Sequence, residues 1–437
     1  MFAERRQKLL ESMGPDAVLV LVGARLAVRS ADTEFPFRQD SDFWYLTGFD
    51  HPDAVAVLST RAGAPAYTLF VQPRDRAAET WTGFRPGVEG AVADHGADQA
   101  FPRETLLEKL PELLRGARRI HHTLGRDAEI DARIVSLQDE IRRQSRGGVL
   151  PAEAIVDPRL EIHEMRMRKS ADEIAIMQRA ADISLEAHRR AAGLARDGRY
   201  EYELEAELGH VFRASGGAGP AYGSIVGGGV NATILHYIRN DQRLSAGDLV
   251  LIDAGVELEG YASDVTRTYP VDGKFEPAAR DVYEIVLAAQ LAAIEASGPG
   301  RTLPEVHDAA LRVLCEGLVT LGILEGGVDE IVETETYKPY YMHGTSHWLG
   351  LDVHDVGAYV TRDASGATQP RKLEPGMAYT IEPGLYIAVD DPKAPAALKG
   401  LGVRIEDDVV ITEDGILNLN RDIPKTVDAI EAWVRGT

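Results

Sequence analysis

The chain has 437 residues and a mass of 47.6 kDa, which is enough for two or three domains with sizeable cores. Hydrophobic residues make up 44% of it and charged residues 27%, which excludes a disordered, collagenous or coiled-coil chain. Its 47 basic and 69 acidic residues give a net charge of −22. A field this negative argues against nucleic acid or an anionic membrane as the main partner.

The cysteine content and the hydropathy narrow the class further. Cys315 is the single cysteine, so the chain can form neither an intramolecular disulfide nor a Cys-x-x-Cys site. The longest apolar run, Ala17–Ala24, has 8 residues, whereas a membrane span needs about 20. The charged start of the chain lacks the apolar stretch of a signal peptide. We therefore expect a cytoplasmic protein that does not enter a membrane.

The N-terminal third alternates strand-like and helix-like segments, as an α/β domain does. Strands are predicted over 16–23, 54–58 and 66–71, and helices over 104–110 and 130–143. Glycines and prolines between residues 147 and 158 then break the pattern. We therefore assign residues 1–155 to an N-terminal domain and residues 156–437 to a C-terminal one.

The C-terminal part mixes helices with antiparallel-looking strands. Ser170 and Glu173 have capping-box spacing and predict the start of a helix. Further helices are predicted over 277–296 and 303–321, and strands over 249–255, 261–269, 377–382 and 403–412. This mixture indicates an α+β domain.

Two of these strands carry aspartates that a hairpin would bring together. If the hairpin is centred between Leu258 and Glu259, Asp253 and Asp264 face each other with Cβ atoms about 5 Å apart. The apolar run 249–252 indicates that the pair is buried, and a buried carboxylate pair needs a shared proton or a cation. A solvated hairpin edge is the alternative, and this segment alone does not decide between the two.

Three of the 12 histidines, His343, His347 and His354, fall within 12 positions. The first two have the i, i+4 spacing of a metal-binding helix, but residues 344–346 between them are poor helix formers. We therefore expect a loop that runs into a strand. A single histidine is more often structural, whereas three in one glycine-containing segment favour a functional site.

Two glutamates complete a group of oxygen ligands. Glu382 ends a predicted strand just before Pro383-Gly384, and Glu406 shares a strand face with Arg404. Each could be a surface acid on its own. The four acids together carry a charge of −4, which balances two divalent ions, and one histidine adds a nitrogen ligand. The candidate metal ligands are Asp253, Asp264, His347, Glu382 and Glu406.

The ligand types indicate which metal such a site would take. A site rich in oxygen with one nitrogen suits Mn²⁺ best, with Co²⁺, Fe²⁺ or Zn²⁺ as alternatives, and it lacks the thiolates of structural zinc sites. Two ions about 3.5–4 Å apart can hold a bridging hydroxide as nucleophile and polarise a carbonyl.

These residues resemble a known family. The order Asp-x₁₀-Asp, His, Glu, Glu is similar to the ligand set of the pita-bread metallopeptidases, which include methionine aminopeptidase, prolidase and aminopeptidase P. The proline-specific branch is matched by three motifs: His343-Gly-x-Ser-His347-x-x-Gly-x-x-x-His354-Asp355, Glu382-Pro-Gly-Leu-Tyr386 and Gly402-Val-Arg-Ile-Glu-Asp-Asp408. The segment 38–49 resembles the N-terminal domain of bacterial aminopeptidase P, so the resemblance covers essentially the whole chain.

The resemblance implies roles for particular residues. Glu382 would be the general base, and His236 and His354 would stabilise the tetrahedral intermediate. His343 and Tyr386 would line the substrate side. Arg404 would pair with a nearby carboxylate and orient it. Trp81 would reach the active site of a neighbouring subunit in a homo-oligomer, a dimer or a tetramer. The composition of Gln369–Lys372 departs from the family, so the outer substrate contacts stay unassigned.

The expected function is therefore metal-dependent removal of the N-terminal residue from peptides with proline at position 2. A prolidase restricted to Xaa-Pro dipeptides is the nearest alternative. An inactive peptide-binding protein and a metal-free creatine-amidinohydrolase-like enzyme on the same fold are less favoured, because they would not need these acids. The glycine-rich segment 216–229 lacks the ending of a phosphate loop and is interpreted as a loop that leads to His236.

Overall fold

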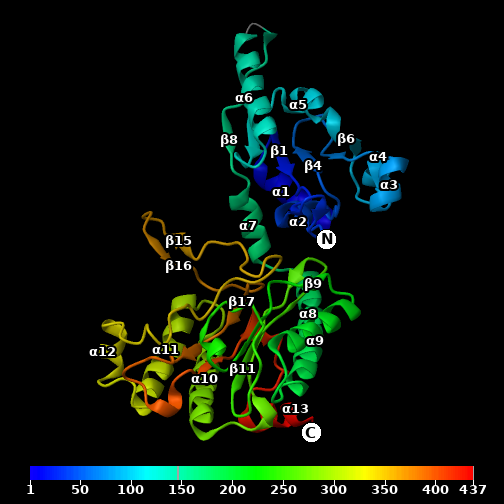
Figure 1. The fold of residues 1–437 in the computed structure, drawn as a ribbon. Coiled ribbons are helices and arrows are strands. Elements are labelled where there is room, and N and C mark those ends of the chain that lie inside the picture. Colours follow the sequence, from blue (N-terminus) through cyan, green and yellow to red (C-terminus); the bar gives the residue numbers. More distant parts are fainter. Residues whose placement is uncertain (145–146, 437) are drawn as a thin grey trace. The chain divides into compact units, whose positions relative to one another are not determined.

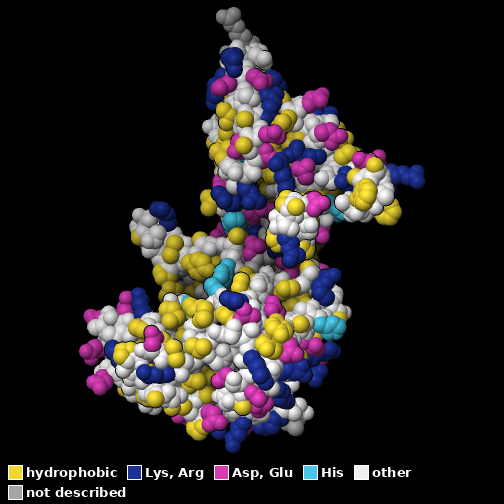
Figure 2. All heavy atoms as spheres, viewed as in Figure 1, with side chains coloured by type: hydrophobic (Ala, Val, Ile, Leu, Met, Phe, Trp, Pro, Cys, Tyr) yellow, Lys and Arg dark blue, Asp and Glu magenta, His cyan; other side chains and the backbone are white. Residues whose placement is uncertain are grey.

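The computed structural model describes residues 1–144 and 147–436, and the chain divides into two compact units, Met1–Met165 and Arg166–Thr437 (Figure 1). The domain boundary expected between residues 155 and 156 stays a prediction. Within the described ranges, no helix is both long and apolar enough to cross a bilayer. Figure 2 shows acidic and basic side chains interspersed over the visible face of each unit.

Unit 1 is built on a six-stranded mixed sheet in the order β6-β5-β4-β1-β7-β8. The strands predicted over 16–23, 54–58 and 66–71 and the two predicted helices are confirmed as β1, β4, β5, α5 and α6. Helix α6 buries Ile130, Ile134, Leu137 and Ile141 at helical spacing against this sheet. The strands are β1 (Ala17–Val22), β2 (Val28–Ser30), β3 (Thr33–Glu34), β4 (Val55–Ser59), β5 (Tyr67–Val71), β6 (Gln99–Pro102), β7 (Arg119–His122) and β8 (Ala154–Val156). The helices are α1 (Phe2–Met13), α2 (Ser41–Thr47), α3 (Arg76–Thr82), α4 (Gly87–Ala93), α5 (Leu106–Leu114) and α6 (Ala128–Arg143), and α7 (Arg159–Met167) spans the boundary between the two units.

Unit 2 consists of short antiparallel sheets that lie between the helix pairs α8–α9 and α10–α11 (Figure 1). The expected capping box is present, with Ser170 and Glu173 satisfying each other's backbone at the start of α8. The strands are β9 (Gly219–Pro220), β10 (Ile225–Gly228), β11 (Leu249–Asp253), β12 (Val256–Leu258), β13 (Tyr261–Ala262), β14 (Thr266–Pro270), β15 (Val360–Arg362), β16 (Thr368–Pro370), β17 (Ala378–Ile381), β18 (Gly384–Tyr386), β19 (Gly402–Arg404), β20 (Asp407–Ile411) and β21 (Ile416–Asn418). The helices are α8 (Ala171–Gly193), α9 (Glu201–Ala214), α10 (Pro277–Ala296), α11 (Leu303–Thr320), α12 (Val328–Glu333) and α13 (Val427–Arg435).

The predicted register of the aspartate hairpin is wrong. Leu258 pairs with Tyr261, so the turn consists of Glu259 and Gly260, with φ of 50° and 83°. Positive φ at both central residues is the geometry of a tight hairpin turn and moves the hairpin centre by one residue. Asp253 therefore pairs with Thr266 rather than with Asp264.

A break in the same hairpin replaces the continuous strand expected over 261–269. The ladder is interrupted between β13 and β14, and Asp264 lies in the interruption. The opposite strand passes so close that a Cβ on Gly255 would lie 1.7 Å from the carbonyl oxygen of Ser263. Only glycine fits there, and the break directs Asp264 away from the ladder.

The strand expected over 403–412 is also interrupted. Its first part, β19, pairs with β18, whereas its second part, β20, pairs with β17. The chain changes sheets at Ile405 and Glu406, where the backbone N–H of Glu406 donates to the carbonyl of Thr266. The glycine-rich segment differs from the expected loop as well, because residues 225–228 form β10 against β11.

Candidate active site

Four of the five candidate metal ligands share a position relative to the sheets: each of the carboxylates lies where a ladder ends or is interrupted. Asp253 ends β11, Asp264 lies between β13 and β14, and Glu382 follows β17. Glu406 lies between β19 and β20, and His347 lies in an irregular loop held on β17, where its backbone N–H donates to Thr380. Side chains at such breaks are free to turn toward a common point while the strands fix their backbones.

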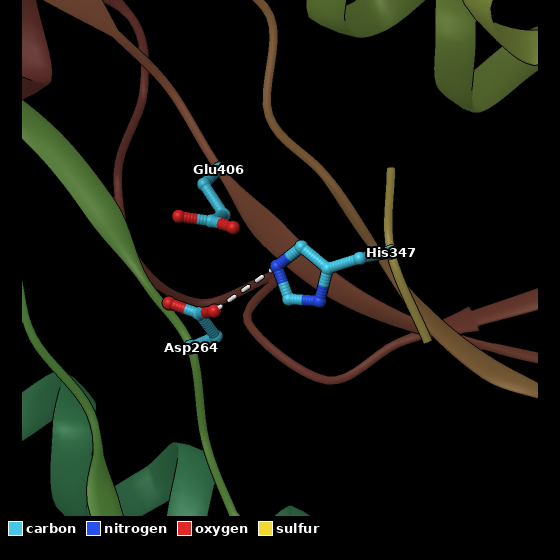
Figure 3. Close-up of side chains that lie close together, drawn as sticks. All are labelled: Asp264, His347 and Glu406. Carbon is cyan, nitrogen blue, oxygen red and sulfur yellow. Dashed lines mark ion pairs between the residues drawn. The ribbon is translucent and has the colours of Figure 1, made fainter. Parts of the chain in front are cut away.

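Three of the five converge most closely (Figure 3). One ligand atom each from Asp264, His347 and Glu406 lies within 4.8 Å of the others. The Nε2 atom of His347 is 3.4 Å from Oδ2 of Asp264 and 3.6 Å from Oε1 of Glu382. Asp253 joins the group through the hydroxyl of Tyr222, which lies 2.6 Å from Oδ1 of Asp253 and 2.5 Å from Oδ1 of Asp264. The structure thus brings all five candidates together.

The contacts of the Tyr222 hydroxyl show that the site lacks positive charge. The hydroxyl has one proton and can donate to only one of the two carboxylate oxygens that approach it. The other contact sets a lone pair against a carboxylate in a buried place, since Asp253 is 8% and Asp264 4% exposed. A cation between these oxygens would remove the repulsion.

The pKa values show the same crowding of negative charge. Burial raises the pKa of Glu382 to about 7, with Asp264 and Asp253 contributing and His347 opposing. Burial and three neighbouring carboxylates raise the pKa of Glu406 well above its usual range. The pKa of His347 is raised to about 9, because Asp264 and Glu382 outweigh the effect of its burial. The cluster has a shortage of positive charge that a divalent ion would fill.

The hydrogen bonds of His347 fit a role as a metal ligand. Its Nδ1 lies 3.0 Å from the carbonyl oxygen of Trp348, which can only accept. Nδ1 must therefore carry a proton, and Nε2 faces the carboxylates, where a metal ion that displaces its proton would find the Nε2 lone pair. One nitrogen and four carboxylates, without thiolates, suit a divalent ion with oxygen preference.

Arg404 organises one side of the cluster. Its Nη2 donates to Oδ2 of Asp253 at 2.6 Å, and its Nε donates to the hydroxyl of Thr266 at 3.1 Å. Thr266 in turn donates to Oε2 of Glu406 at 2.6 Å. One guanidinium thus orients two carboxylates, the first directly and the second through a hydroxyl.

Tyr386 and His343 continue this network toward the cavity. The Tyr386 hydroxyl accepts from Nη1 of Arg404 at 3.0 Å and lies 2.8 Å from Nε2 of His343. Nδ1 of His343 lies 2.8 Å from the Gly344 carbonyl and must donate to it. Burial lowers the pKa of His343 to about 4, so this histidine is neutral and accepts from Tyr386.

A cavity of about 480 Å³ lies over the cluster. The His354 ring lies at its wall against His347, with centroids 4.3 Å apart. His236 lines the cavity from the turn after residues 229–233. Its other walls are apolar and include Ile225, Leu235, Ile238 and Val353.

Two further predicted elements of the site lie outside this cavity lining. Trp81 belongs to α3 of unit 1 and is 88% exposed. Of the segment Gln369–Lys372, residues up to Pro370 belong to β16.

Sequence reasoning missed two residues of this site. Tyr222 lies within the glycine-rich segment, and its position between Ala221 and Gly223 was the available signal, since a lone tyrosine among small residues has room to reach a site. Thr266 carried no local signal, because threonine is common in strands. Its role depends on the strand register.

The fold and the site define a class of protein. A model of metallopeptidase family M24 matches residues 175–413, more than half of the chain, and a model of the aminopeptidase P N-terminal domain matches residues 2–121. The chain belongs to metallopeptidase family M24 and has the two-part organisation of the aminopeptidase P group. The expected fold class, an α/β N-terminal domain plus an α+β pita-bread domain, is confirmed, and divalent metal ions are the cofactor of this class.

Individual relatives extend along the whole chain. The Xaa-Pro aminopeptidase of Escherichia coli (strain K12) is 44% identical over 432 residues, which cover 99% of this chain and 96% of that protein. The structure of Pseudomonas aeruginosa aminopeptidase PepP has a TM-score of 0.95 and 46% identity, and covers 100% of this chain and 97% of that one. Zinc-substituted E. coli aminopeptidase P in complex with product has a TM-score of 0.93 and 44% identity, and covers 99% of this chain and 97% of that one.

Proposed function

We propose that this protein removes the N-terminal residue from peptides whose second residue is proline. The observation that carries the proposal is the buried group of four carboxylates and one imidazole at the floor of a cavity with apolar walls. The similarity to Xaa-Pro aminopeptidases over nearly the whole chain supports the proline specificity.

Asp253, Asp264, His347, Glu382 and Glu406 would hold two divalent ions, with Mn²⁺ as the first choice. When bound, such ions lower the pKa of a water molecule and polarise the carbonyl of the scissile bond. The carboxylates of the cluster would also attract the free amino group of a peptide, and this sets the cut one residue from the N-terminus.

The side chains around the cluster would carry the proton transfers. Glu382 has a raised pKa and lies at the cavity, so it would accept a proton from the attacking water and pass it to the leaving nitrogen. His236 and His354 line the same cavity and would donate to the oxygen of the tetrahedral intermediate. The Xaa-Pro nitrogen has no N–H, and none of these steps requires one.

The decisive experiment compares an Xaa-Pro-Xaa tripeptide with an Xaa-Pro dipeptide, each with Mn²⁺ and with chelator. We expect metal-dependent cleavage of the tripeptide, and we expect Asp264→Ala to abolish it. Cleavage of the dipeptide alone would make the protein a prolidase. Failure to bind Mn²⁺ at saturating concentration would favour an inactive binding protein on this fold.

We also propose a homo-oligomer in which Trp81 reaches the site of a neighbouring subunit. An indole that is 88% exposed in the single chain is a large apolar group that an interface would cover. Trp81→Ala should weaken hydrolysis of longer peptides and leave Mn²⁺ content unchanged. Unaltered kinetics would contradict this role.

A further inference from the structure

Gly350 and Asp355 are among the residues of the motif from His343 to Asp355 that the proposed reaction does not use. Asp355 follows His354 directly, yet its side chain is buried rather than in the cavity, with 1% exposed. Its Oδ1 accepts from Nη2 of Arg166 at 2.6 Å, and its Oδ2 accepts from Nζ of Lys169 at 3.0 Å. The side chains of both cations are also buried, 3% and 1% exposed.

Gly350 makes this pairing sterically possible. An added Cβ at Gly350 would lie 2.2 Å from Oδ2 of Asp355 and 2.9 Å from Cε of Lys169. The glycine of the motif therefore leaves the space that the buried ion pair fills. Its carbonyl accepts from the N–H of Ala262, two residues before Asp264.

The ion pair is connected to two of the three histidines of the same motif, His347 and His354. The N–H of Asp355 donates to the carbonyl of Trp348 at 2.8 Å. The same carbonyl accepts from Nδ1 of His347 at 3.0 Å, and so it holds the ring with Nε2 toward the carboxylates. His354, next to Asp355 in the chain, packs its ring against the His347 ring.

We propose that Asp355 is a positioning residue that sets the orientation of the His347 and His354 imidazoles. Its two buried cations anchor it to residues 166–169, whose backbone is fixed in turn by the pairing of Arg168 with Met377, the residue before β17. The loop of residues 348–355 is thereby held at both ends. The Trp348 carbonyl accepts from the N–H of Asp355, and the Asp355 carboxylate pairs with the two cations. The kinetic test of this proposal rests on the proposed function, whereas the structural argument for it does not.

The test uses a charge-balanced double variant, Asp355→Asn with Lys169→Met, which removes one buried charge of each sign and so protects folding. We expect kcat on an Xaa-Pro-Xaa tripeptide to fall about 10–100-fold, with KM within about threefold of the wild type. Mn²⁺ affinity, measured by equilibrium dialysis, should weaken about 10-fold. The matched control is Asp352→Asn in the same loop, which also pairs with Arg166, at 2.8 Å, but is partly exposed. It should keep wild-type kcat and Mn²⁺ affinity.

Each outcome decides the matter. A folded double variant with wild-type kcat and Mn²⁺ affinity, altered only in its unfolding midpoint, would show a merely structural ion pair and overturn the proposal. If the double variant does not fold, Gly350→Ala tests the same contact without a charge change and should reproduce the pattern. If the wild-type protein does not cleave the tripeptide, the proposed function fails, while the comparison of Mn²⁺ affinities still tests the positioning role.

Discussion

Glu406 and Asp407 are neighbours in the chain, are both fully buried, and meet opposite electrostatic surroundings. Burial raises the pKa of Glu406, and Asp264, Glu382 and Asp253 raise it further. Burial alone would also raise the pKa of Asp407, but Arg267 and Lys425 outweigh it and hold this pKa well below its usual range. Glu406 lies just before β20, where the chain changes sheets, and its side chain meets the carboxylates, whereas Asp407, the first residue of β20, meets the cations.

Two cations and two side-chain amides donate to the Asp407 carboxylate and compensate its negative charge. Its Oδ1 accepts from Arg267 at 2.7 Å, and its Oδ2 accepts from Lys425 at 2.6 Å, Asn418 at 2.7 Å and Gln290 at 2.9 Å. Glu406 accepts from Thr266 alone among the hydrogen bonds described for its carboxylate. A buried acid satisfied by the protein stabilises the fold, whereas a buried acid left among other acids provides a binding site for a cation.

Glu406→Gln should have the largest effect of the substitutions considered, and the effect should be on activity rather than on stability. The substitution removes one of the proposed metal ligands, and loss of several kcal/mol of transition-state stabilisation corresponds to a fall in kcat/KM of about 10³-fold or more. Because it also removes a repelling charge, the unfolding free energy of the metal-free protein should stay equal or rise. Tripeptide kinetics and urea unfolding in chelator check the two parts. A destabilised metal-free variant would contradict the idea that Glu406 is under repulsion.

Asp407→Asn should have the opposite profile. It leaves the buried Arg267 and the half-buried Lys425 without their counter-charge, which costs about 3–5 kcal/mol of unfolding free energy. Glu413→Gln on the nearby exposed turn is the matched control and should stay within about 0.5 kcal/mol of the wild type. Urea unfolding in the presence of chelator measures both. Equal stability of the two variants would mean that the Asp407 network contributes nothing to the fold.

The smallest expected effect is on the pH dependence of the unfolding free energy of the metal-free protein, to which Glu382 and Asp407 should contribute with opposite signs. The pKa of Glu382 is about 7 in the folded chain and about 4.5 without its surroundings, so the folded state holds this proton more tightly. Its contribution is therefore fully present below pH 4.5 and is lost as the pH rises through 7, by up to about 3 kcal/mol. Asp407 has the reverse sign, since stability is lost only as the pH falls below its unfolded pKa of about 3.8.

Comparison of the wild type with Glu382→Gln isolates this contribution. Between pH 5 and pH 7.5, the wild type in chelator should lose more unfolding free energy than the variant, and saturating Mn²⁺ should reduce the loss in the wild type. Groups common to both proteins cancel in the difference. Parallel curves for the two proteins would refute the raised pKa of Glu382.

Much of the fold was readable from local pattern. Strands β1, β4 and β5 and helices α5, α6, α8, α10 and α11 follow from apolar periodicity and from caps such as Ser170 with Glu173, because these signals act within a few residues. The register of the aspartate hairpin was not readable, because it depends on which two residues take positive φ. The breaks at Asp264 and Glu406 depend on partner strands that are distant in sequence.

The sequence alone identified four acids and four histidines of the site, in motifs typical of one family and in a chain with a matching N-terminal segment. The tertiary structure decided what each residue faces. Whether Glu406 or Asp407 meets carboxylates, whether Tyr222 reaches two aspartates, and whether Asp355 finds Arg166 and Lys169 all depend on long-range packing. Charge–charge energies in a buried site are set by distances of a few ångströms, and no local pattern encodes those distances.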